Sequence, residues 1–318
     1  MLVYSFDIGG SSIKHGLVDI VNGKASIVAR GETIMLPNNS FSYLKGEILK
    51  VISSISNLNE KIDIIGLSTT GSVDPYGKVV NAGHFDGYTN ISWDDIINKE
   101  YHNDFEVKVI NDGRASAWGE YFAYGRSYKT HVHVVVGTGV GGGIIYSDKL
   151  LLGDSGFSGY IGHIKISLND TITCSCGKKG CVETLASVPA IIEFYRKHSD
   201  CIQPKTFKEI IELATSGEHI AIQALEEAGY WLGVGIGCVL NVLNPSLVSV
   251  GGGVPLATTE LLSLNQGDLY FESLLKGAEQ SAHKRVFVSS DIKKAVLGND
   301  AGLIGAACLA SLRRSKYH

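Results

Sequence analysis

The stretch that decides the fold is LVYSFDIGGSSIKHGLV, residues 2–18. An apolar run at 2–8 ends in a polar turn at 9–12, and a second apolar run follows at 13–18. Short apolar runs separated by glycine and serine are typical of strands joined by a tight turn. The chain is therefore predicted to begin with a β-hairpin.

The same unit returns about 125 residues later. The strand-like VHVVV at 132–136 runs into the glycine-rich GTGVGGG at 137–143, and IIY at 144–146 resumes the apolar pattern. A repeated unit of this kind predicts two lobes of related architecture. The expected lobes are 1–120 with a C-terminal helix at about 298–318, and 121–297.

Hydrophobic periodicity predicts helices and strands through the rest of the chain. Helices are expected at 41–58, 114–124, 188–197, 207–215, 220–243 and 300–312. Further strands are expected at 62–68, 105–110, 247–250 and 285–288. Strands that alternate with helices indicate an α/β protein, in which ligands bind beyond the strand ends.

The composition narrows the class of protein. The 318 residues are 44% hydrophobic and 19% charged, as in a globular protein with a sizeable interior. A net charge of -4 argues against nucleic-acid binding. The most apolar stretch, 228–240, is too short to span a bilayer, and the run before Asp7 is too short for a secretion signal. We expect a cytoplasmic protein that binds neither nucleic acid nor membrane.

Three glycine-rich turns each follow an apolar strand. They are Gly9-Gly10-Ser11-Ser12, Gly137-Thr138-Gly139 and Gly251-Gly252-Gly253. Glycine lets the backbone approach an anion, and N–H and hydroxyl groups can then bind phosphate oxygens. Each turn alone could be an ordinary tight turn, but three of them at strand ends favour a nucleotide site. The sequence has no P-loop signature, and the 137–142 glycines lead to a strand and not to the helix of a dinucleotide fold.

Two carboxylates also lie at predicted strand ends. Asp7 precedes the first glycine turn, and Asp112 lies between a strand and a helix. Phosphoryl transfer needs a metal ion beside the phosphates and a carboxylate that orients or deprotonates the attacking hydroxyl. The two aspartates can fill those roles, although Asp112 could instead cap the helix.

One imidazole and three thiols form the strongest metal signal. His163 is followed by CSCGKKGC, which contributes Cys174, Cys176 and Cys181. These residues provide the donors of a closed, tetrahedral Cys₃His zinc site, which is structural because protein fills all four positions. The alternative is a set of buried free thiols. Such a zinc ion would order the loop that carries Glu183.

Together these motifs resemble those of the ROK family of sugar kinases and repressors over nearly the whole chain. The resemblance rests on DIGGSSIK at 7–14, Asn111-Asp112, the 137–139 turn, Gly162-His163 and CSCGKKGCVE at 174–183. It implies an actin-like (ribonuclease H-like) ATPase fold, with two lobes and a cleft between them. It also implies ATP-dependent phosphorylation of a hexose or hexose derivative at its 6-hydroxyl.

The resemblance implies a role for each motif residue. Asp112 would be the general base and Asp7 would lie near Mg²⁺. The implied ATP contacts are Asp7, Gly9, Gly10, Ser11, Ser12, Lys14, Gly137, Thr138, Gly139, Gly252 and Gly253. The implied sugar contacts are Gly71, Asn81, His84, Asn111, Asp112, Tyr160, His163 and Glu183. The implied zinc ligands are His163, Cys174, Cys176 and Cys181, with the second ring nitrogen of His163 toward the sugar. Family members are usually dimers or tetramers, so a homodimer or homotetramer is expected.

The chain departs from the family pattern in two places. The usual Gly-Glu-x-Gly-His reads GYIGH at 159–163, so Tyr160 replaces a carboxylate, and STTG at 68–71 replaces Thr-Pro-Gly. Loss of a hydrogen-bond acceptor leaves substrate hydroxyls unpaired unless the substrate lacks them. We therefore expect a sugar modified at C1 or C2, such as a β-glucoside or an N-acetylhexosamine.

Two other functions within the family fit less well. The repressors carry a DNA-binding helix-turn-helix ahead of the kinase-like lobes, whereas the lobes here begin at residue 2. A catalytically silent sugar sensor would fit the Tyr160 substitution. Such a sensor has no need of a base, so the presence of both Asp7 and Asp112 argues against it.

Overall fold

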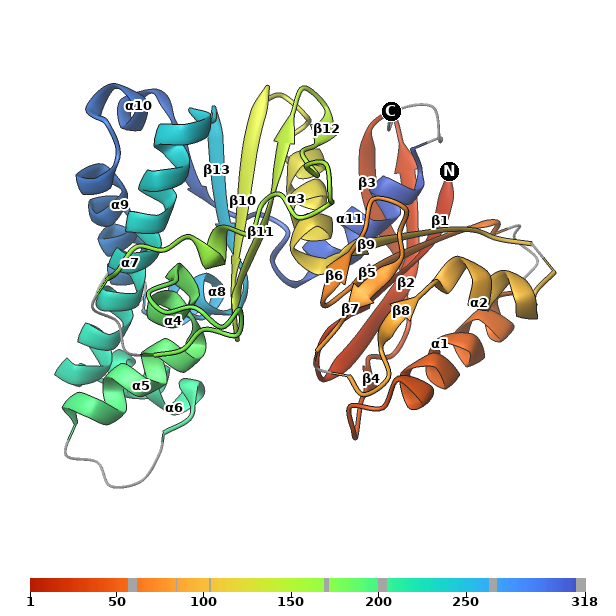
Figure 1. The fold of residues 1–318 in the computed structure, drawn as a ribbon, viewed down its shortest axis with the longest axis horizontal. Helices are drawn as coiled ribbons and strands as arrows, with labels where there is room; N and C mark the ends of the chain where they lie inside the picture. The colour runs from red at the N-terminus through yellow and green to blue at the C-terminus, as the bar shows by residue number, and fades with distance from the viewer. Residues whose placement is uncertain are drawn as a thin grey trace. The chain divides into compact units, whose positions relative to one another are not determined.

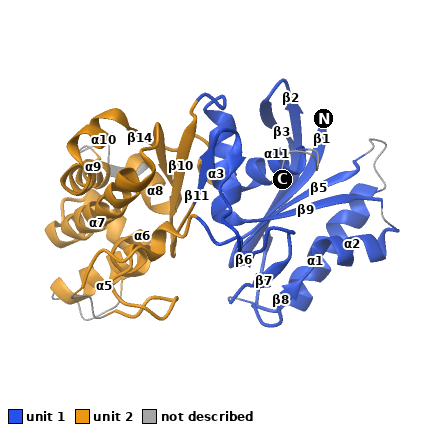
Figure 2. Ribbon diagram, turned by 45° about the horizontal axis from the view of Figure 1, so that its top comes forward, with its two compact units in different colours: residues 1–127, 143–158, 300–318 blue, residues 128–142, 159–299 orange. Residues whose placement is uncertain are grey.

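The structure is a computed structural model that describes residues 1–56, 62–83, 85–102, 104–168, 172–199, 205–262 and 268–312. It consists of two compact units, coloured separately in Figure 2. Unit 1 comprises 1–127, 143–158 and the chain from 300 onward, and unit 2 comprises 128–142 and 159–299. Residues 143–158 thus group with the N-terminal part of the chain, and so does the last helix.

Unit 1 is built on a sheet of order β3-β2-β1-β5-β9, with β4 paired to β2 and a separate small sheet β6-β7-β8. Strand β1 is antiparallel to β2 and parallel to β5, which is parallel to β9. The strands are β1 (Leu2–Ile8), β2 (Ser12–Val21), β3 (Lys24–Arg30), β4 (Ile34–Met35), β5 (Ile64–Thr69), β6 (Ser72–Val73), β7 (Val79–Asn81), β8 (Thr89–Ile91), β9 (Glu106–Asn111) and β12 (Lys149–Leu150). The helices are α1 (Phe41–Ser56), α2 (Trp93–Glu100), α3 (Asp112–Ala123) and α11 (Ala301–Ala310).

Alternation along β1 explains why helices cover both faces of this sheet (Figure 1). Tyr4, Phe6 and Ile8 point to one face and share a core with the buried side of α1. Val3 points the other way and packs with residues of α11, toward which Ser5 also donates a hydrogen bond. Asp7 belongs to this second set by the same period of two. The sequence of β1 therefore directs the carboxylate to the face that α11 covers.

Unit 2 contains the second hairpin, whose β11 (Val140–Tyr146) begins in this unit and continues into unit 1. Its strand order is β11-β10-β13-β14, with β10 parallel to β13 and β13 parallel to β14. The other strands are β10 (Thr130–Val136), β13 (Leu247–Gly251) and β14 (Asp291–Lys294). The helices are α4 (Val182–Ala186), α5 (Val188–His198), α6 (Phe207–Thr215), α7 (His219–Leu243), α8 (Gly253–Leu262), α9 (Leu269–Ser281) and α10 (Lys284–Ser289), with 3₁₀ turns at Ile161–His163 and Gly298–Asp300.

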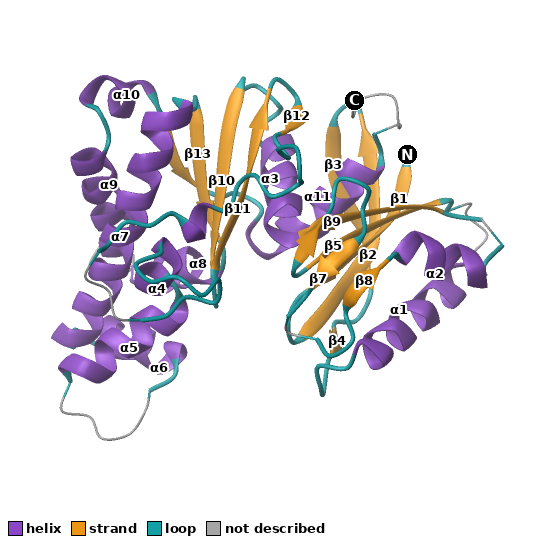
Figure 3. Ribbon diagram, in the orientation of Figure 1, coloured by secondary structure: helices purple, strands orange, loops and turns teal. Residues whose placement is uncertain are grey.

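The glycine-rich apolar stretch at 228–240 lies inside α7, where it packs against α9 (Figure 3). A Cβ added at Gly233 would lie only 2.0 Å from the carbonyl oxygen of Leu274. The missing side chain therefore lets the two helix backbones approach closely. Among the described residues, no helix combines the length and the apolar character that crossing a membrane requires.

A chain of buried polar side chains links β10 to β13. His131 Nε2 and His133 Nδ1 lie 2.7 and 2.8 Å from the Ser249 hydroxyl oxygen. Burial lowers the pKa of His131 to about 4 and that of His133 to about 3, so both imidazoles are neutral at pH 7. The serine thus joins two strands whose ends carry glycine turns.

One predicted strand was wrong. Residues 285–288 lie in the helix α10, and the edge strand is β14, which begins at Asp291. None of the side chains of α10 is buried, so the short apolar run at 286–288 fills no sheet face. Asn241 of α7 accepts a hydrogen bond from the His283 N–H, and Asn244, the C-cap of α7, accepts one from the Ser289 hydroxyl. These two bonds hold both ends of α10.

Candidate active site

Asp7 lies near the carboxyl end of β1, an interior strand of the unit 1 sheet. Its Oδ1 accepts a hydrogen bond of 2.8 Å from the Ser68 hydroxyl, which the parallel register places directly beside it on β5. Lys14 is its partner in register on β2. Burial raises the pKa of Asp7, the Asp300 carboxylate adds to the rise, and Ser68 and Lys14 oppose it. The carboxylate is thus held in a fixed position with a cation nearby.

Asp112 is half-buried and occupies the first position of α3, directly after β9. Its Oδ1 accepts hydrogen bonds from Gly113 N–H at 2.7 Å and from Asn111 Nδ2 at 2.8 Å. Burial raises the pKa of Asp112 to about 6, with a smaller contribution from the Asp7 carboxylate. A carboxyl with this pKa is suited to take up a proton near neutral pH.

The helix cap at this position belongs to the residue before Asp112. Asn111 Oδ1 accepts the Arg114 N–H at 3.3 Å and is the N-cap side chain of α3. Because Asn111 caps the helix, Asp112 is not needed for that purpose, and the helix starts two residues earlier than the predicted 114.

Three of the predicted sugar contacts of unit 1 lie together beside Asp112. Asn111 Nδ2 donates to the Gly71 carbonyl at 2.8 Å, so both of its N–H groups are used within the protein. Gly71 has a φ of +90° and lies so close to Asn81 that a Cβ there would be 2.4 Å from its carbonyl oxygen. His84 lies outside the described residues.

The predicted phosphate contacts divide between the two units. In unit 1, Gly9 N–H bonds the Ser12 carbonyl at 2.9 Å, which closes the turn between β1 and β2 and leaves Gly10 and Ser11 exposed. Lys14 lies two residues after Ser12, on β2.

In unit 2, two glycine turns end the neighbouring strands β10 and β13. Gly137 N–H bonds the Gly139 carbonyl at 2.9 Å, and Thr138 at the tip is exposed. Gly252 has a φ of +99°, and a Cβ there would be 2.4 Å from the Val136 carbonyl oxygen. The ten-residue helix α8 begins at Gly253, where its first N–H groups can bind an anion. The structure therefore brings the two turns of unit 2 side by side.

His163, Cys174, Cys176 and Cys181 converge in unit 2. One ligand atom from each lies within 4.8 Å of all the others. His163 Nδ1 is 3.4 Å from Cys174 Sγ, and the Sγ atoms of Cys176 and Cys181 are 3.7 Å apart. Tetrahedral zinc with bonds of about 2.3 Å to sulfur separates its sulfur ligands by roughly 3.7 Å. The four side chains therefore fit such an ion.

The three thiols differ in how readily they ionise when no metal ion is bound. Burial raises the pKa of Cys174 and, to about 12, that of Cys181, whereas the Lys178 N–H lowers that of Cys176. A bound metal ion reverses the cost of ionisation, because thiolates are its ligands. Since Nδ1 of His163 faces the thiols, Nε2 is the ring nitrogen left for another partner.

Glu183, at the start of α4, connects the cysteine loop to the glycine turn of β10. Its Oε2 accepts the Val140 N–H at 3.0 Å, and its Oε1 accepts the Ser175 hydroxyl at 2.9 Å. A Cβ on Gly139 would be 2.6 Å from Oε2. The carboxylate thus joins two predicted parts of the site within unit 2, the metal loop and a phosphate turn.

Tyr160 precedes the 3₁₀ turn that carries His163. Its side chain is 43% exposed, and its ring centroid is 5.7 Å from that of His163. An aromatic surface therefore adjoins the imidazole at the place where the family pattern has a carboxylate.

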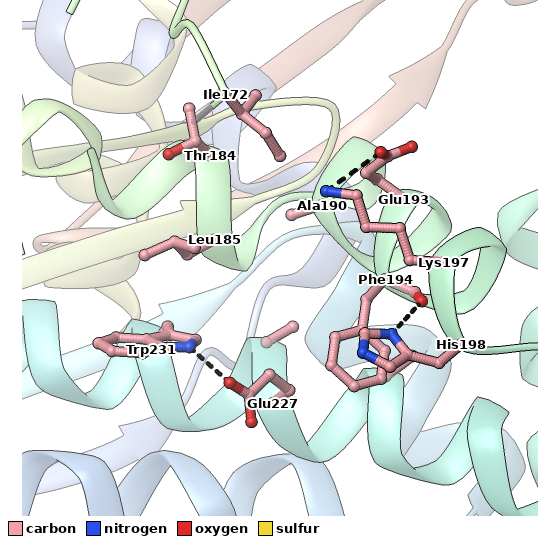
Figure 4. A pocket seen from close by; sticks show the side chains of 12 residues that line it. Ile172, Thr184, Leu185, Ala190, Glu193, Phe194, Lys197, His198, Glu227 and Trp231 are labelled. Carbon is pink, nitrogen blue, oxygen red and sulfur yellow. Dashed lines mark hydrogen bonds and ion pairs between the residues drawn. The ribbon is translucent and has the colours of Figure 1, made fainter. Parts of the chain in front are cut away.

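A pocket in unit 2 is lined mainly by side chains of α4, α5 and α7 (Figure 4). The Lys197–Glu193 ion pair and the Trp231 N–H bond to Glu227 border its apolar floor. None of the predicted site residues lines this pocket. It therefore belongs neither to the cysteine cluster nor to the glycine turns.

The sequence model of the ROK family matches residues 3–313. The chain belongs to the ROK family. A glucokinase of Halalkalibacterium halodurans is 31% identical over 265 residues, which cover 77% of this chain and 75% of that protein. The N-acetylmannosamine kinase of Yersinia pestis is 28% identical over 310 residues, 96% of this chain and 97% of that one.

A crystal structure of a ROK family glucokinase from Streptomyces griseus, in complex with glucose and AMPPNP, gives a TM-score of 0.79 at 27% identity. The match covers 97% of this chain and 99% of that one. ROK sugar kinases have the actin-like ATPase fold, so the predicted fold class is confirmed.

Two contacts of the site were missing from the sequence prediction. Ser68 bonds Asp7, and Ser175 bonds Glu183. Both serines lie inside stretches that the sequence had singled out, 68–71 and 174–183. The register of β1 against β5 would have identified Ser68, because parallel pairing places it opposite Asp7.

Proposed function

We propose that this ROK protein is an ATP-dependent sugar kinase that phosphorylates a hexose or hexose derivative at the 6-hydroxyl. The observation that carries the proposal is a pair of carboxylates at the carboxyl ends of two strands of the unit 1 sheet, Asp7 near the end of β1 and Asp112 directly after β9. Asp7 has a hydroxyl and a cation as neighbours, whereas Asp112 is fixed by two N–H donors and has a pKa raised to about 6. The glucokinase and N-acetylmannosamine kinase relatives support the reaction class.

Asp112 would act as the general base. Both of its hydrogen bonds go to Oδ1, which sets the plane of the carboxylate and leaves Oδ2 to accept the proton of the sugar hydroxyl. Loss of that proton raises the nucleophilicity of the hydroxyl oxygen as it attacks the γ-phosphorus, and the bond from that phosphorus to the β,γ-bridging oxygen breaks to release ADP. The proton on Asp112 is then released to solvent, because a carboxyl with a pKa near 6 is mostly ionised at pH 7.

The nucleotide would be held by the glycine turns, through backbone N–H groups and the hydroxyls of Ser11, Ser12 and Thr138. Asp7 would hold Mg²⁺, which when bound neutralises phosphate charge. Lys14, in register with Asp7, would contact the phosphates. His163, Cys174, Cys176 and Cys181 would hold a structural Zn²⁺, and the turns of the cysteine loop then stay in place beside Glu183.

The sugar is proposed to carry a substituent at C1 or C2. Tyr160 is exposed, aromatic and adjacent to His163, and it offers no carboxylate to accept hydrogen bonds from free hydroxyls. Without that carboxylate, a β-glucoside or an N-acetylhexosamine loses fewer hydrogen bonds than free glucose does, because one of its hydroxyls at C1 or C2 is substituted. Turnover of free glucose that equals or exceeds turnover of these sugars would refute this part of the proposal.

The test is an ADP-release assay with MgATP against glucose, mannose, fructose, N-acetylglucosamine, N-acetylmannosamine, cellobiose and a β-glucoside. Asp112→Asn serves as the control. Turnover of one sugar that is lost in the control supports the kinase and names its substrate class. Sugar binding by calorimetry without turnover of any sugar would instead favour a catalytically silent sensor, and light scattering on the same sample tests the proposed dimer or tetramer.

A further inference from the structure

The carboxylate of Asp7 faces the first turn of α11, at Gly302. A Cβ built on Gly302 would lie 2.6 Å from Asp7 Oδ1, 2.8 Å from Cγ and 2.9 Å from Oδ2. The whole carboxylate thus covers the position that any other side chain would fill. Ordinary contact to a Cβ begins near 3.4 Å, so Oδ1 would have to retreat by about 0.8 Å.

The oxygen nearest to Gly302 is also the one that Ser68 holds. Ser68 donates to Asp7 Oδ1 from β5, on the sheet side of the carboxylate. A methyl group added at Gly302 would press on that oxygen. It would therefore weaken the Ser68 bond and rotate the carboxylate away from its present direction.

Helix α11 cannot easily move away to make room. The Ser5 hydroxyl donates to the Leu303 carbonyl at 2.7 Å, one residue after Gly302. Asp300, just before the helix, accepts a two-pronged pair of hydrogen bonds from Arg30 at 2.8 and 2.6 Å. Further along, Ala307 is fully buried against Val3 of β1. The short Asp7 side chain is consequently the part that yields.

We propose that Gly302 is a positioning residue for Asp7: its lack of a side chain sets the direction in which the carboxylate presents its oxygens to the metal–nucleotide. The proposal rests on the proposed kinase function and adds a residue that acts through Asp7. Outer contacts that orient metal-binding carboxylates commonly matter about 10- to 100-fold in metal affinity or activity.

The deciding variant is Gly302→Ala. The higher helix propensity of alanine, about 1 kcal/mol, offsets part of the cost of crowding Asp7, so the variant should fold with at most a small drop in melting temperature. Binding of Mn²⁺ in the presence of a non-hydrolysable ATP analogue, followed by electron paramagnetic resonance, should weaken about 10- to 100-fold. The KM for MgATP should rise in parallel, while sugar binding measured by calorimetry stays at the wild-type value.

A matched control separates positioning from general damage to α11. Cys308→Ala removes a fully buried side chain from the same helix, away from Asp7, and should lower the melting temperature with Mn²⁺ binding unaltered. A double-mutant cycle with Ser68→Ala supplies a second measure, because both changes act on the same oxygen. Their effects on Mn²⁺ binding should be less than additive, whereas independent structural effects would add.

The outcomes distinguish the inference from the function on which it rests. If the wild-type protein binds no Mn²⁺–nucleotide and turns over no sugar, the proposed function fails. If the wild type is active and Gly302→Ala keeps wild-type Mn²⁺ binding, or its effect adds fully to that of Ser68→Ala, the positioning role of Gly302 is overturned. If Gly302→Ala does not fold, Ser68→Ala alone still tests the hold on Oδ1, and wild-type Mn²⁺ binding in that variant would overturn the proposal.

Discussion

Replacing Asp112 with asparagine should slow the chemical step and at the same time stabilise the protein at neutral pH. A positioned general base contributes typically 10²- to 10⁴-fold, so kcat should fall by that factor, or about 2.7–5.4 kcal/mol in activation free energy. Asparagine keeps an Oδ1 that can accept the bonds from Gly113 N–H and Asn111. The geometry and the sugar affinity should therefore be preserved.

The stability gain follows from the direction of the pKa shift. Burial raises the pKa of Asp112 from 3.8 to about 6, so the folded state binds more protons than the unfolded state between those values. Stability from this group is complete below pH 3.8 and is lost as pH rises to about 6. Two pKa units correspond to at most about 3 kcal/mol, less for a carboxyl with some exposure. Asparagine cannot ionise, so the variant does not lose this stability as the pH rises.

The assay is a pair of measurements on the two proteins between pH 4 and 8. Wild-type kcat/KM should fall about tenfold per unit below pH 6, and this limb should be absent from the residual activity of Asp112→Asn. The melting temperature of the variant should exceed that of wild type at pH 8 by about 2–4 °C per kcal/mol gained, and the two should converge near pH 4. Unchanged turnover, or a variant that is less stable at pH 8, would refute the reasoning.

Other predictions test the second unit. Cys176→Ser should abolish bound zinc by atomic absorption and lower the melting temperature, and equal zinc content in both proteins would contradict the ligand assignment. Glu183→Gln should raise the KM for both ATP and sugar, because it weakens the link between the cysteine loop and the Val140 turn; an effect on sugar alone would show that no such link operates. Ser249→Ala should cost about 1–3 kcal/mol, measured by urea unfolding at pH 7.5, since two buried histidines lose a partner. The free energy of unfolding of the wild type should also fall as pH drops below 6.5. His131 and His133 then bind protons in the unfolded state but stay neutral in the folded state, where their pKa values are lowered.

Elements with a strong local period could be predicted from the sequence. The hairpin predicted at 2–18 and the helices predicted at 207–215 and 220–243 are found as β1 with β2, α6 and α7. The exception, α10, depends on two asparagines of α7 that precede it by more than 40 positions. Local propensity carries no information on such a distant partner, so the short apolar run at 286–288 suggested a strand.

The candidate site likewise combines residues that short sequence motifs predicted with residues that only the fold brings beside them. Asp7, Asp112 and the cysteine cluster belong to short motifs whose residue types already suggest their chemistry. The contacts that orient them come from far along the chain: Ser68 follows Asp7 by 61 positions, and Gly302 lies at the other end of the sequence. Only the pairing of β1 with β5 and the packing of α11 bring these residues together. A glycine in particular gives no chemical signal until the space beside it is known.

The two aspartates show how one sheet edge can prepare similar groups for different tasks. Burial raises the pKa of each, and a second carboxylate adds to each rise: Asp300 at Asp7, and Asp7 at Asp112. At Asp7 the Ser68 hydroxyl and the Lys14 ammonium oppose the rise in pKa, and Lys14 places a cation in register beside the carboxylate. At Asp112 the opposing groups are neutral N–H donors, and the pKa reaches about 6. Because environments that treat two carboxyls differently commonly mark different roles, these different neighbours support the proposed metal binding by Asp7 and proton transfer by Asp112.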